Sequence, residues 1–278
     1  MDAAEKKQLE ITACKVRMGI IEGVHSAKSG HPGGSLSCAD ILTYLYFKHM
    51  NIDPANPKKA DRDRFVLSKG HAVPALYATL ANRGYFDVSL IKTLRHIGSI
   101  LQGHPDMKHI PGVDMSTGSL GQGISAAVGM ALSAKHFGDS FKVYAVLGDG
   151  EIEEGQVWEA AMFAGNKGLS NLTAFVDYNN LQIDGTIEEV NSAAPIDKKF
   201  EAFGWHVITI DGHSFEEIEN ALKEAETVDK PVAIIAKTVK GKGVSFMENA
   251  VGWHGSAPND EQYEQAMTEL NAALAALN

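Results

Sequence analysis

The sequence predicts an α/β fold in which a mainly parallel sheet carries helices on both faces. Residues 141–147 and 172–176 are short apolar runs rich in β-forming residues, and a helix-like segment over 156–167 lies between them. Two strands joined through a helix lie parallel in one sheet. The 278 residues are 44% hydrophobic and 22% charged, an ordinary globular composition, and contain no Gly/Ser-rich linker. We therefore expect residues 1–278 to form a single domain.

The N-terminal elements are expected to be two helices around a glycine-rich loop. Apolar residues recur at helical spacing over 5–28 and again over 37–50. Residues 29–34 between them contain Pro32 and three glycines, which cannot continue a helix. His31 therefore lies on a loop held between helices, where functional groups often concentrate.

A predicted strand over 64–67 ends in Ser68-Lys-Gly-His71, before a helix that reaches about residue 83. A strand, a glycine turn and a helix N-terminus together receive anions, so His71 is a candidate donor to a phosphate oxygen. A core or helix-capping role for the same histidine is the alternative. Residues 84–117 are rich in loops and lead to an alanine- and glycine-rich helix over 124–136.

The C-terminal elements repeat the α/β pattern. Residues 205–210 and 232–236 are predicted to be strands, with a helix over 214–227 between them. Lys240-Gly-Lys-Gly243 is expected to be a mobile basic loop, for which a solvated turn and a substrate contact are equally open. Residues 260–277 carry an apolar stripe and are predicted to form a terminal helix.

Polar residues follow the two strands over 141–147 and 172–176. Asp149 lies in Gly148-Asp-Gly150, and Asn179 follows the second strand. Ligands of parallel sheets gather beyond the carboxyl ends of the strands, so both side chains are expected in one crevice. Carboxylate and amide oxygens suit Mg²⁺ or Ca²⁺ better than Zn²⁺, and flanking glycines let the backbone approach an anion. The pattern predicts a metal-bridged diphosphate site, with ordinary turn residues as the alternative.

Charge and composition exclude several classes of function. The net charge is −10 and no run of lysine or arginine occurs, which argues against a nucleic-acid or anionic-membrane surface. No apolar run approaches the ~18 residues of a membrane span. Dinucleotide and P-loop motifs are also missing from the sequence. The cysteines, Cys14 and Cys38, are expected to be core thiols of a cytoplasmic protein.

Ordered motifs from about residue 8 to 258 resemble those of transketolases. Gly148-Asp-Gly150, then 28 residues, then Asn179-Asn180 is similar to the thiamine diphosphate fingerprint. Further motifs occur in the same order as in transketolases, among them Ser29-Gly-His-Pro-Gly33, Gly70-His71, Gly103-His-Pro105, Thr117-Gly118, Leu120-Gly-Gln-Gly123, Asp211-Gly-His213 and His254-Gly255. The resemblance implies the thiamine diphosphate-binding fold, in its diphosphate-binding domain.

The resemblance also implies the cofactors and the residues that hold them. Thiamine diphosphate would bind together with Mg²⁺, for which Ca²⁺ or Mn²⁺ would substitute. Asp149, Asn179 and the Leu181 carbonyl would be the metal ligands. The implied cofactor contacts are Ser68, His71, Gly118, Ser119, Leu120, Gly150, Asn179 and His254.

Three histidines are implied to serve catalysis. By the resemblance His31, His104 and His254 would contact the sugar substrate and its intermediate. Imidazoles titrate near neutrality, so they can hydrogen-bond a hydroxyl and relay its proton. A zinc site built from the three histidines is the alternative, although none of them has the His-x-x-x-His spacing on a helix.

Glu154 is implied to join a carboxylate network that crosses the subunit interface. Its position at the start of the helix over 156–167 is equally consistent with a helix N-terminal acid. Glu151 and Glu153 make this turn acidic, so mutual repulsion is expected to raise carboxylate pKa values here. Ser119 and Lys69 depart from the proline and asparagine found in many transketolases, which leaves donor and acceptor preference open.

The implied activity is transfer of a two-carbon ketol unit from a ketose phosphate to an aldose phosphate, as in the pentose phosphate pathway. Transketolases continue into a pyrimidine-binding domain, which supplies an activating glutamate, and a C-terminal domain. We expect these on a partner subunit, in an α2β2 heterotetramer that is active only when assembled. The alternatives are a deoxyxylulose-phosphate synthase, a 2-oxo acid dehydrogenase component, or a catalytically silent cofactor-binding subunit.

Overall fold

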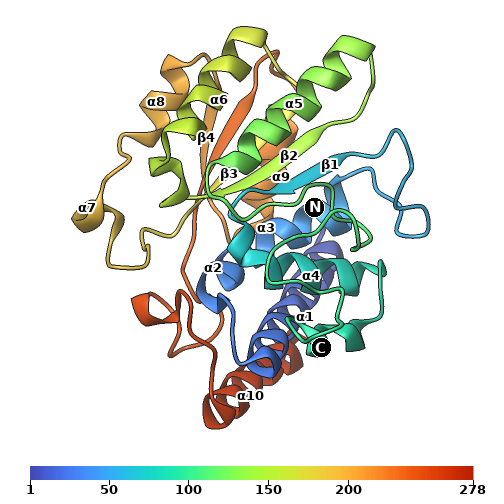
Figure 1. Cartoon of the computed structure of the whole chain (residues 1–278), viewed down its shortest axis with the longest axis vertical. Coiled ribbons are helices and arrows are strands. Elements are labelled where there is room, and N and C mark those ends of the chain that lie inside the picture. The colour runs from blue at the N-terminus through green and yellow to red at the C-terminus, as the bar shows by residue number, and fades with distance from the viewer. Residues whose placement is uncertain (278) are drawn as a thin grey trace.

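Five parallel strands form one sheet in the order β1-β2-β3-β5-β4 (Figure 1). The computed structural model describes residues 1–277. The strands are β1 (Arg64–Leu67), β2 (Val143–Gly148), β3 (Leu172–Tyr178), β4 (His206–Asp211) and β5 (Val232–Lys237). The predicted parallel sheet is confirmed, and each predicted strand agrees with the observed one to within two residues at either end.

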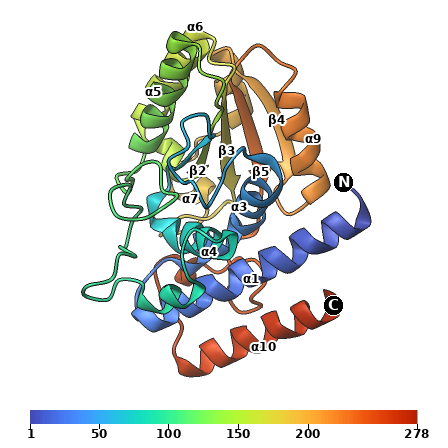
Figure 2. The same ribbon diagram turned by 90° about the vertical axis from the view of Figure 1, so that its right-hand side faces the viewer.

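Helices cover both faces of this sheet (Figures 1 and 2). Helices α5, α6 and α8 pack on one face, and α3 and α9 pack on the other, where α1, α4 and α10 extend the same core. The α-helices are α1 (Ala3–Ala27), α2 (Pro32–Ser37), α3 (Ala39–Tyr44), α4 (Val73–Arg83), α5 (Gln122–Phe137), α6 (Gly155–Lys167), α7 (Ile187–Val190), α8 (Ile196–Ala202), α9 (Phe215–Ala225) and α10 (Asp260–Leu277). Shorter elements are the π-helix η1 (Leu45–His49) and the 3₁₀ helices η2 (Gly70–Ala72), η3 (Val88–Thr93), η4 (Glu151–Glu153) and η5 (Val251–Trp253).

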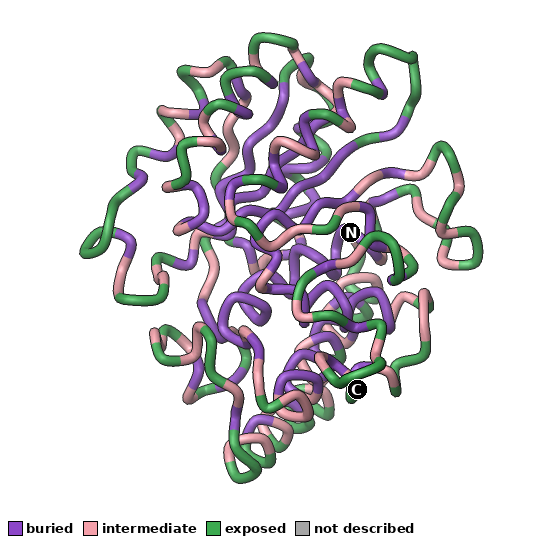
Figure 3. The backbone as a smooth tube through the Cα atoms, viewed as in Figure 1, coloured by how far each residue is buried: buried purple, intermediate pink, exposed green. Residues whose placement is uncertain are grey.

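The central strands β2, β3 and β5 are apolar along most of their length because the two faces of the sheet bury alternate side chains. Tyr144 and Val146 of β2 belong to the core shared with α3 and α9, whereas Val143, Ala145 and Leu147 belong to the core shared with α5 and α6. Successive residues of a strand point to opposite faces, so a sheet covered on both sides needs apolar residues at every position. Figure 3 shows the resulting buried centre of the molecule.

The helices differ from the prediction mainly near the N-terminus. The loop predicted over 29–34 ends earlier than expected, because the chain is helical from Pro32. Proline is well accommodated at the first position of a helix, where its missing N–H needs no partner. The single helix predicted over 37–50 is instead α3 followed by η1, and Cys38 interrupts it. Helices α7 and α8 were not predicted, because four and seven residues are too short to show a helical period.

Both cysteines are buried free thiols, as predicted. No helix within residues 1–277 has the length and apolarity needed to cross a membrane. The carboxyl ends of β2 and β3 lie near the centre of the molecule, between the two helical layers (Figure 1).

Two helical glycines provide a matched test of packing against helix propensity. A Cβ at Gly165 of α6 would lie 1.7 Å from the Phe203 carbonyl oxygen, whereas a Cβ at Gly129 of α5 meets nothing within 4 Å. We expect Gly165→Ala to lower the free energy of unfolding by at least about 2 kcal/mol, because the backbone must shift. Gly129→Ala should raise it by up to about 1 kcal/mol through helix propensity.

Urea unfolding of the two variants measures both changes. Equal effects of the two substitutions would show that the close approach of α6 to Phe203 does not exist in solution.

Candidate active site

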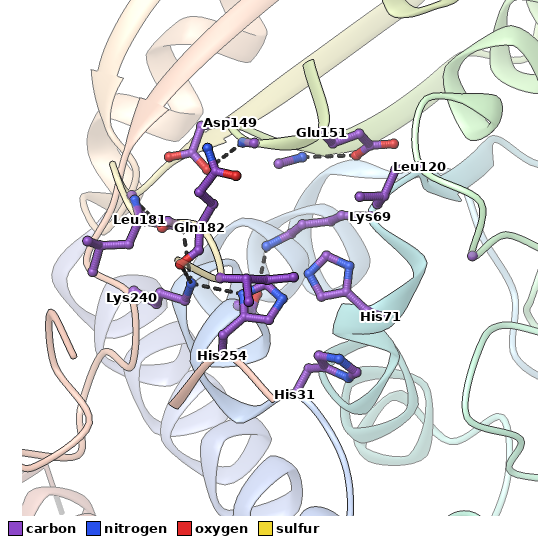
Figure 4. A pocket seen from close by; sticks show the side chains of 16 residues that line it. His31, Lys69, His71, Leu120, Asp149, Glu151, Leu181, Gln182, Lys240 and His254 are labelled. Atoms are coloured by element: carbon purple, nitrogen blue, oxygen red, sulfur yellow. Dashed lines mark hydrogen bonds between the residues drawn. The ribbon is translucent and has the colours of Figure 1, made fainter. Parts of the chain in front are cut away.

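A pocket of about 260 Å³ lies beyond the carboxyl ends of β2 and β3 (Figure 4). Its walls come from the turns after β1, β2 and β3, from the loop before α5, and from the segments around residues 31, 240 and 254. The lining residues used below are His31, Lys69, His71, Gly118, Leu120, Asp149, Gly150, Asn179, Leu181, Lys240 and His254. The parallel register places Gly148 opposite Asp177, so Asp149 and Asn179 emerge side by side.

Asp149 is a buried carboxylate that needs a cation. It is 3% exposed, and its two oxygens accept hydrogen bonds from the backbone N–H groups of Gly150 (2.9 Å) and Asn180 (2.6 Å). Burial, and then the nearby charge of Asp177, raise the pKa of Asp149 to about 7. A positive charge at this position would reverse that shift.

Asn179 and Leu181 complete a set of hard oxygen donors beside Asp149. The Asn179 side-chain oxygen accepts from the Leu181 N–H at 3.1 Å, and the Leu181 carbonyl accepts from the Lys240 ammonium at 3.1 Å. A carboxylate, an amide oxygen and a carbonyl are the donors preferred by Mg²⁺ and Ca²⁺. Together with the raised pKa of Asp149, this donor set fits a divalent hard cation.

Lys240 is buried, although it was predicted on a mobile basic loop, and it lines the pocket rather than lying in a solvated turn, the other alternative left open for this loop. The Lys240 side chain is 1% exposed, and its Nζ lies 2.9 Å from His254 Nδ1. Burial is the main cause that lowers the pKa of Lys240 to about 8. A buried ammonium that lines a pocket without a carboxylate bonded to it is suited to an anionic ligand.

Three histidine rings stand against one another on the opposite wall of the pocket (Figure 4). The ring centroids of His31 and His71 are 5.1 Å apart, and His254 lies 5.5 Å from the first and 5.2 Å from the second. Burial lowers the pKa of His31 and of His254 to about 4 each, with smaller contributions from Arg95 and Lys240 respectively. It also lowers the pKa of His71 well below its usual value. All three imidazoles are therefore neutral at neutral pH.

The third predicted catalytic histidine, His104, lies at the edge of this cluster. It is exposed and its ring packs on Gly118, where a Cβ would come within 2.9 Å of the imidazole. Arg95 connects its loop to that of His31, because the guanidinium donates to the Ser29 hydroxyl (2.8 Å) and to the Gly103 carbonyl (3.4 Å). Partial desolvation of the ring, where it packs on the chain, and then the Arg95 charge lower the pKa of His104 as well.

Ser68 lies just outside the pocket and is hydrogen-bonded to Glu151, which lines it. The Ser68 hydroxyl donates to Glu151, whose carboxylate also accepts from the N–H groups of Gly121 and Gly148 at 3.0 Å each. Ser68 is fully buried and is not part of the pocket wall. Burial, rather than the expected repulsion within the acidic turn, is the first cause of the raised pKa of Glu151.

Two predicted residues lie on the surface. Ser119 is exposed between the pocket residues Gly118 and Leu120. Glu154 is an exposed residue at the start of α6, and its side chain lies close to Gly121. Within residues 1–277 no three His, Cys, Asp or Glu side chains are arranged to hold a metal ion, so the zinc alternative finds no support.

The comparisons with known proteins agree with this geometry. Residues 8–273 match the family described as the thiamine diphosphate-binding domain of transketolase. The chain belongs to the transketolase family. The predicted resemblance and fold are thereby confirmed.

Among transketolase relatives, two bacterial subunits are similar to the chain over nearly their whole length. The 6-deoxy-6-sulfo-D-fructose transketolase subunit of Clostridium sp. (strain MSTE9) is 48% identical over 94% of this chain and 96% of its own. An apulose-4-phosphate transketolase subunit of Phocaeicola vulgatus is 45% identical over 96% and 95%. The chain covers only 46% of the solved transketolase of Campylobacter jejuni, with a TM-score of 0.90 and 34% identity.

Three buried residues in the wall of this pocket were not recognised from the sequence. Glu151 was taken for one member of an acidic turn, and Lys240 for part of a mobile loop. Lys69 was noted only as a departure from the asparagine of many transketolases, but it is buried, lines the pocket and is paired with Asp177. Lysine and glutamate are rarely buried, so the residue type alone predicts a position on the surface. Only the contacts in the folded structure show that these residues are buried.

The buried ammonium can be tested against a second lysine on the same loop. Lys240→Met should weaken binding of inorganic pyrophosphate in the presence of Mg²⁺ by about tenfold or more, because it removes the buried positive charge. Lys242, two residues later, is partly exposed and points to Glu248. Lys242→Met should change the affinity by less than about twofold. Isothermal titration calorimetry measures both, and equal losses would contradict the assignment.

The neutral histidine cluster predicts a pH dependence. His31 and His254 should stay neutral until the pH falls to about 4, whereas in the unfolded chain they protonate near 6.5. Because the unfolded state binds more protons in this window, the free energy of unfolding should fall as the pH drops from 6.5 toward 4. NMR titration of the histidine ring signals measures the pKa values of His31 and His254. Protonation of His31 and His254 near pH 6.5 would overturn the assignment.

Proposed function

We propose that this chain is the diphosphate-binding subunit of a transketolase that transfers a two-carbon ketol unit from a ketose phosphate to an aldose phosphate. One observation carries the proposal. Asp149 and Lys240 line the same pocket as a cluster of neutral histidines. A bound cation would stabilise the buried carboxylate of Asp149, and a bound anion would stabilise the buried ammonium of Lys240. A metal-bound diphosphate would supply the cation and the anion, and a hydroxyl-bearing substrate would supply hydrogen-bond partners for the histidines.

Thiamine diphosphate and Mg²⁺ are the proposed cofactors. Asp149, Asn179 and the Leu181 carbonyl would hold the metal ion. Gly150, without a side chain, would allow the diphosphate to approach, and Lys240 would compensate its charge. When bound, thiamine diphosphate supplies an electron sink for the transferred carbon unit.

The histidines are proposed to bind the sugar and to handle its hydroxyl protons. A neutral imidazole carries one donor and one acceptor, so His31 and His254 can each hold a hydroxyl and receive its proton. His31 Nδ1 is buried without a hydrogen-bond partner among residues 1–277, and a substrate hydroxyl would satisfy it. Arg95 keeps His104 next to this cluster through the two loops that it joins.

We further propose a partner subunit that carries the pyrimidine-binding domain, in an α2β2 assembly. The support is that two relatives of nearly equal length are themselves named subunits. Their names also extend the range of sugars to test to 6-deoxy-6-sulfo-D-fructose and apulose 4-phosphate. The two free buried thiols suit a reducing cytoplasm, where pentose phosphates are interconverted.

Reconstitution with a co-expressed partner candidate tests the proposal. Ketol transfer from xylulose 5-phosphate, apulose 4-phosphate and 6-deoxy-6-sulfofructose should appear only when both chains, thiamine diphosphate and Mg²⁺ are combined. Asp149→Ala in this chain should lower the rate by about 10²-fold or more, because the metal site is lost. Asp229→Ala, at an exposed residue before β5, is the control.

Two outcomes would reject parts of the proposal. Full activity of this chain alone would exclude the need for a partner. An assembled pair that keeps its activity with Asp149→Ala would identify this chain as catalytically silent.

A further inference from the structure

A buried charged cluster outside the pocket connects three elements of the fold. It consists of Arg17 on α1, Asp40 on α3 and His213 in the turn after β4. Asp40 Oδ2 accepts from the Arg17 guanidinium at 2.5 Å, and it lies 2.7 Å from His213 Nδ1. The side chains are only 6–13% exposed, and none lines the pocket.

The outer atoms of this cluster both bind the backbone around Lys240. The Val239 N–H donates to His213 Nε2 at 2.9 Å, and Arg17 Nε donates to the Lys242 carbonyl at 3.1 Å. The cluster therefore holds the chain on both sides of the lysine.

The hydrogen bonds define the form of His213. A backbone N–H can only donate, so His213 Nε2 carries a lone pair and the ring proton resides on Nδ1, facing Asp40. Burial is the largest single influence and opposes the charge of Asp40, but Arg17 and His213 together outweigh it and lower the pKa of this carboxyl. The ionised Asp40 thus orients the ring so that its free nitrogen meets Val239.

The contribution of this cluster to the free energy of unfolding does not by itself explain why charged residues are buried here. A buried ion pair seldom stabilises a protein more than apolar residues of the same size would. A satisfied network does, however, define one geometry, because every member loses a partner if the backbone moves. Here the backbone in question is the segment that carries the buried ammonium of the pocket.

We propose that Arg17, Asp40 and His213 are positioning residues that hold residues 239–242, so that the Lys240 ammonium stays in the pocket beside His254 and the Leu181 carbonyl. The consequence for ligand binding rests on the proposed function, in which Lys240 compensates a diphosphate. The restraint of the segment itself can be measured without any ligand.

Two substitutions of His213 separate its roles. His213→Asn keeps a donor near the Nδ1 position for Asp40 but removes the acceptor for Val239. His213→Gln instead offers an oxygen near the Nε2 position. The matched control is His206→Asn, because His206 on β4 is also bonded to a carboxylate, that of Glu224 (2.6 Å), and lies outside the cluster.

Hydrogen exchange with mass spectrometry on the full chain tests the restraint, and calorimetry with Mg²⁺ and inorganic pyrophosphate tests its consequence. In His213→Asn we expect amide exchange over 239–242 to be about tenfold faster and pyrophosphate affinity to be about tenfold lower. In His213→Gln and His206→Asn both quantities should remain within about twofold of the unmodified protein. Unchanged amide exchange over 239–242 in His213→Asn, or equally fast exchange in His213→Gln, overturns the proposal.

A second variant covers the case in which His213→Asn fails to fold, as judged by circular dichroism. Arg17→Lys keeps a cation for Asp40 but loses the Nε donor to the Lys242 carbonyl, so it should also speed exchange over 239–242. Unchanged exchange in this variant overturns the proposal. If exchange over 239–242 is faster in His213→Asn than in the unmodified chain, but the unmodified chain binds no pyrophosphate, the proposed function fails and the positioning role stands.

Discussion

The ion pair between Lys69 and Asp177 is the contact on which the floor of the pocket depends. Asp177, near the end of β3, is fully buried and also accepts from the hydroxyls of Ser37 and Thr238, while Lys69 donates to the Gly34 carbonyl at 2.6 Å. These bonds join the turn after β1, helix α2, β3 and the segment after β5. Loss of either charge would leave the other uncompensated inside the protein, which is strongly unfavourable, so the four segments hold one arrangement.

The chemistry of the pocket follows from placing charged groups next to this buried pair. Burial raises the pKa of Asp149 and lowers the pKa values of Lys240 and the pocket histidines. Each of these shifts disfavours a charged form in the absence of a ligand. A cation and an anion that enter together would restore the charges of Asp149 and Lys240, while the histidines remain neutral hydrogen-bonding groups. These properties support the proposed binding of a metal-bound diphosphate next to a polyhydroxyl substrate.

The sequence predicted the parts of the fold that depend on local patterns. Strands β2 and β3 and helix α6 have clear apolar runs or helical periods, and they place Asp149 and Asn179 at neighbouring strand ends. The short helices α2, α7 and α8 were missed, because six, four and seven residues are too few to show a helical period. Ser68 was expected in the pocket, but it lies outside the wall, and its hydroxyl donates to Glu151, which does line the pocket.

The sequence by itself determined the parallel α/β sheet, the family and the residue types at the strand ends, because alternation, glycine turns and motif order are properties of the chain read in order. Only the tertiary structure decided which charges are buried and what they meet. Lysine and glutamate are residue types typical of the surface, but Lys240 and Glu151 are part of the site through contacts with residues elsewhere in the sequence. Burial depends on the packing of distant segments, and the free energy of an ionised group depends on its surroundings rather than on its neighbours in the chain.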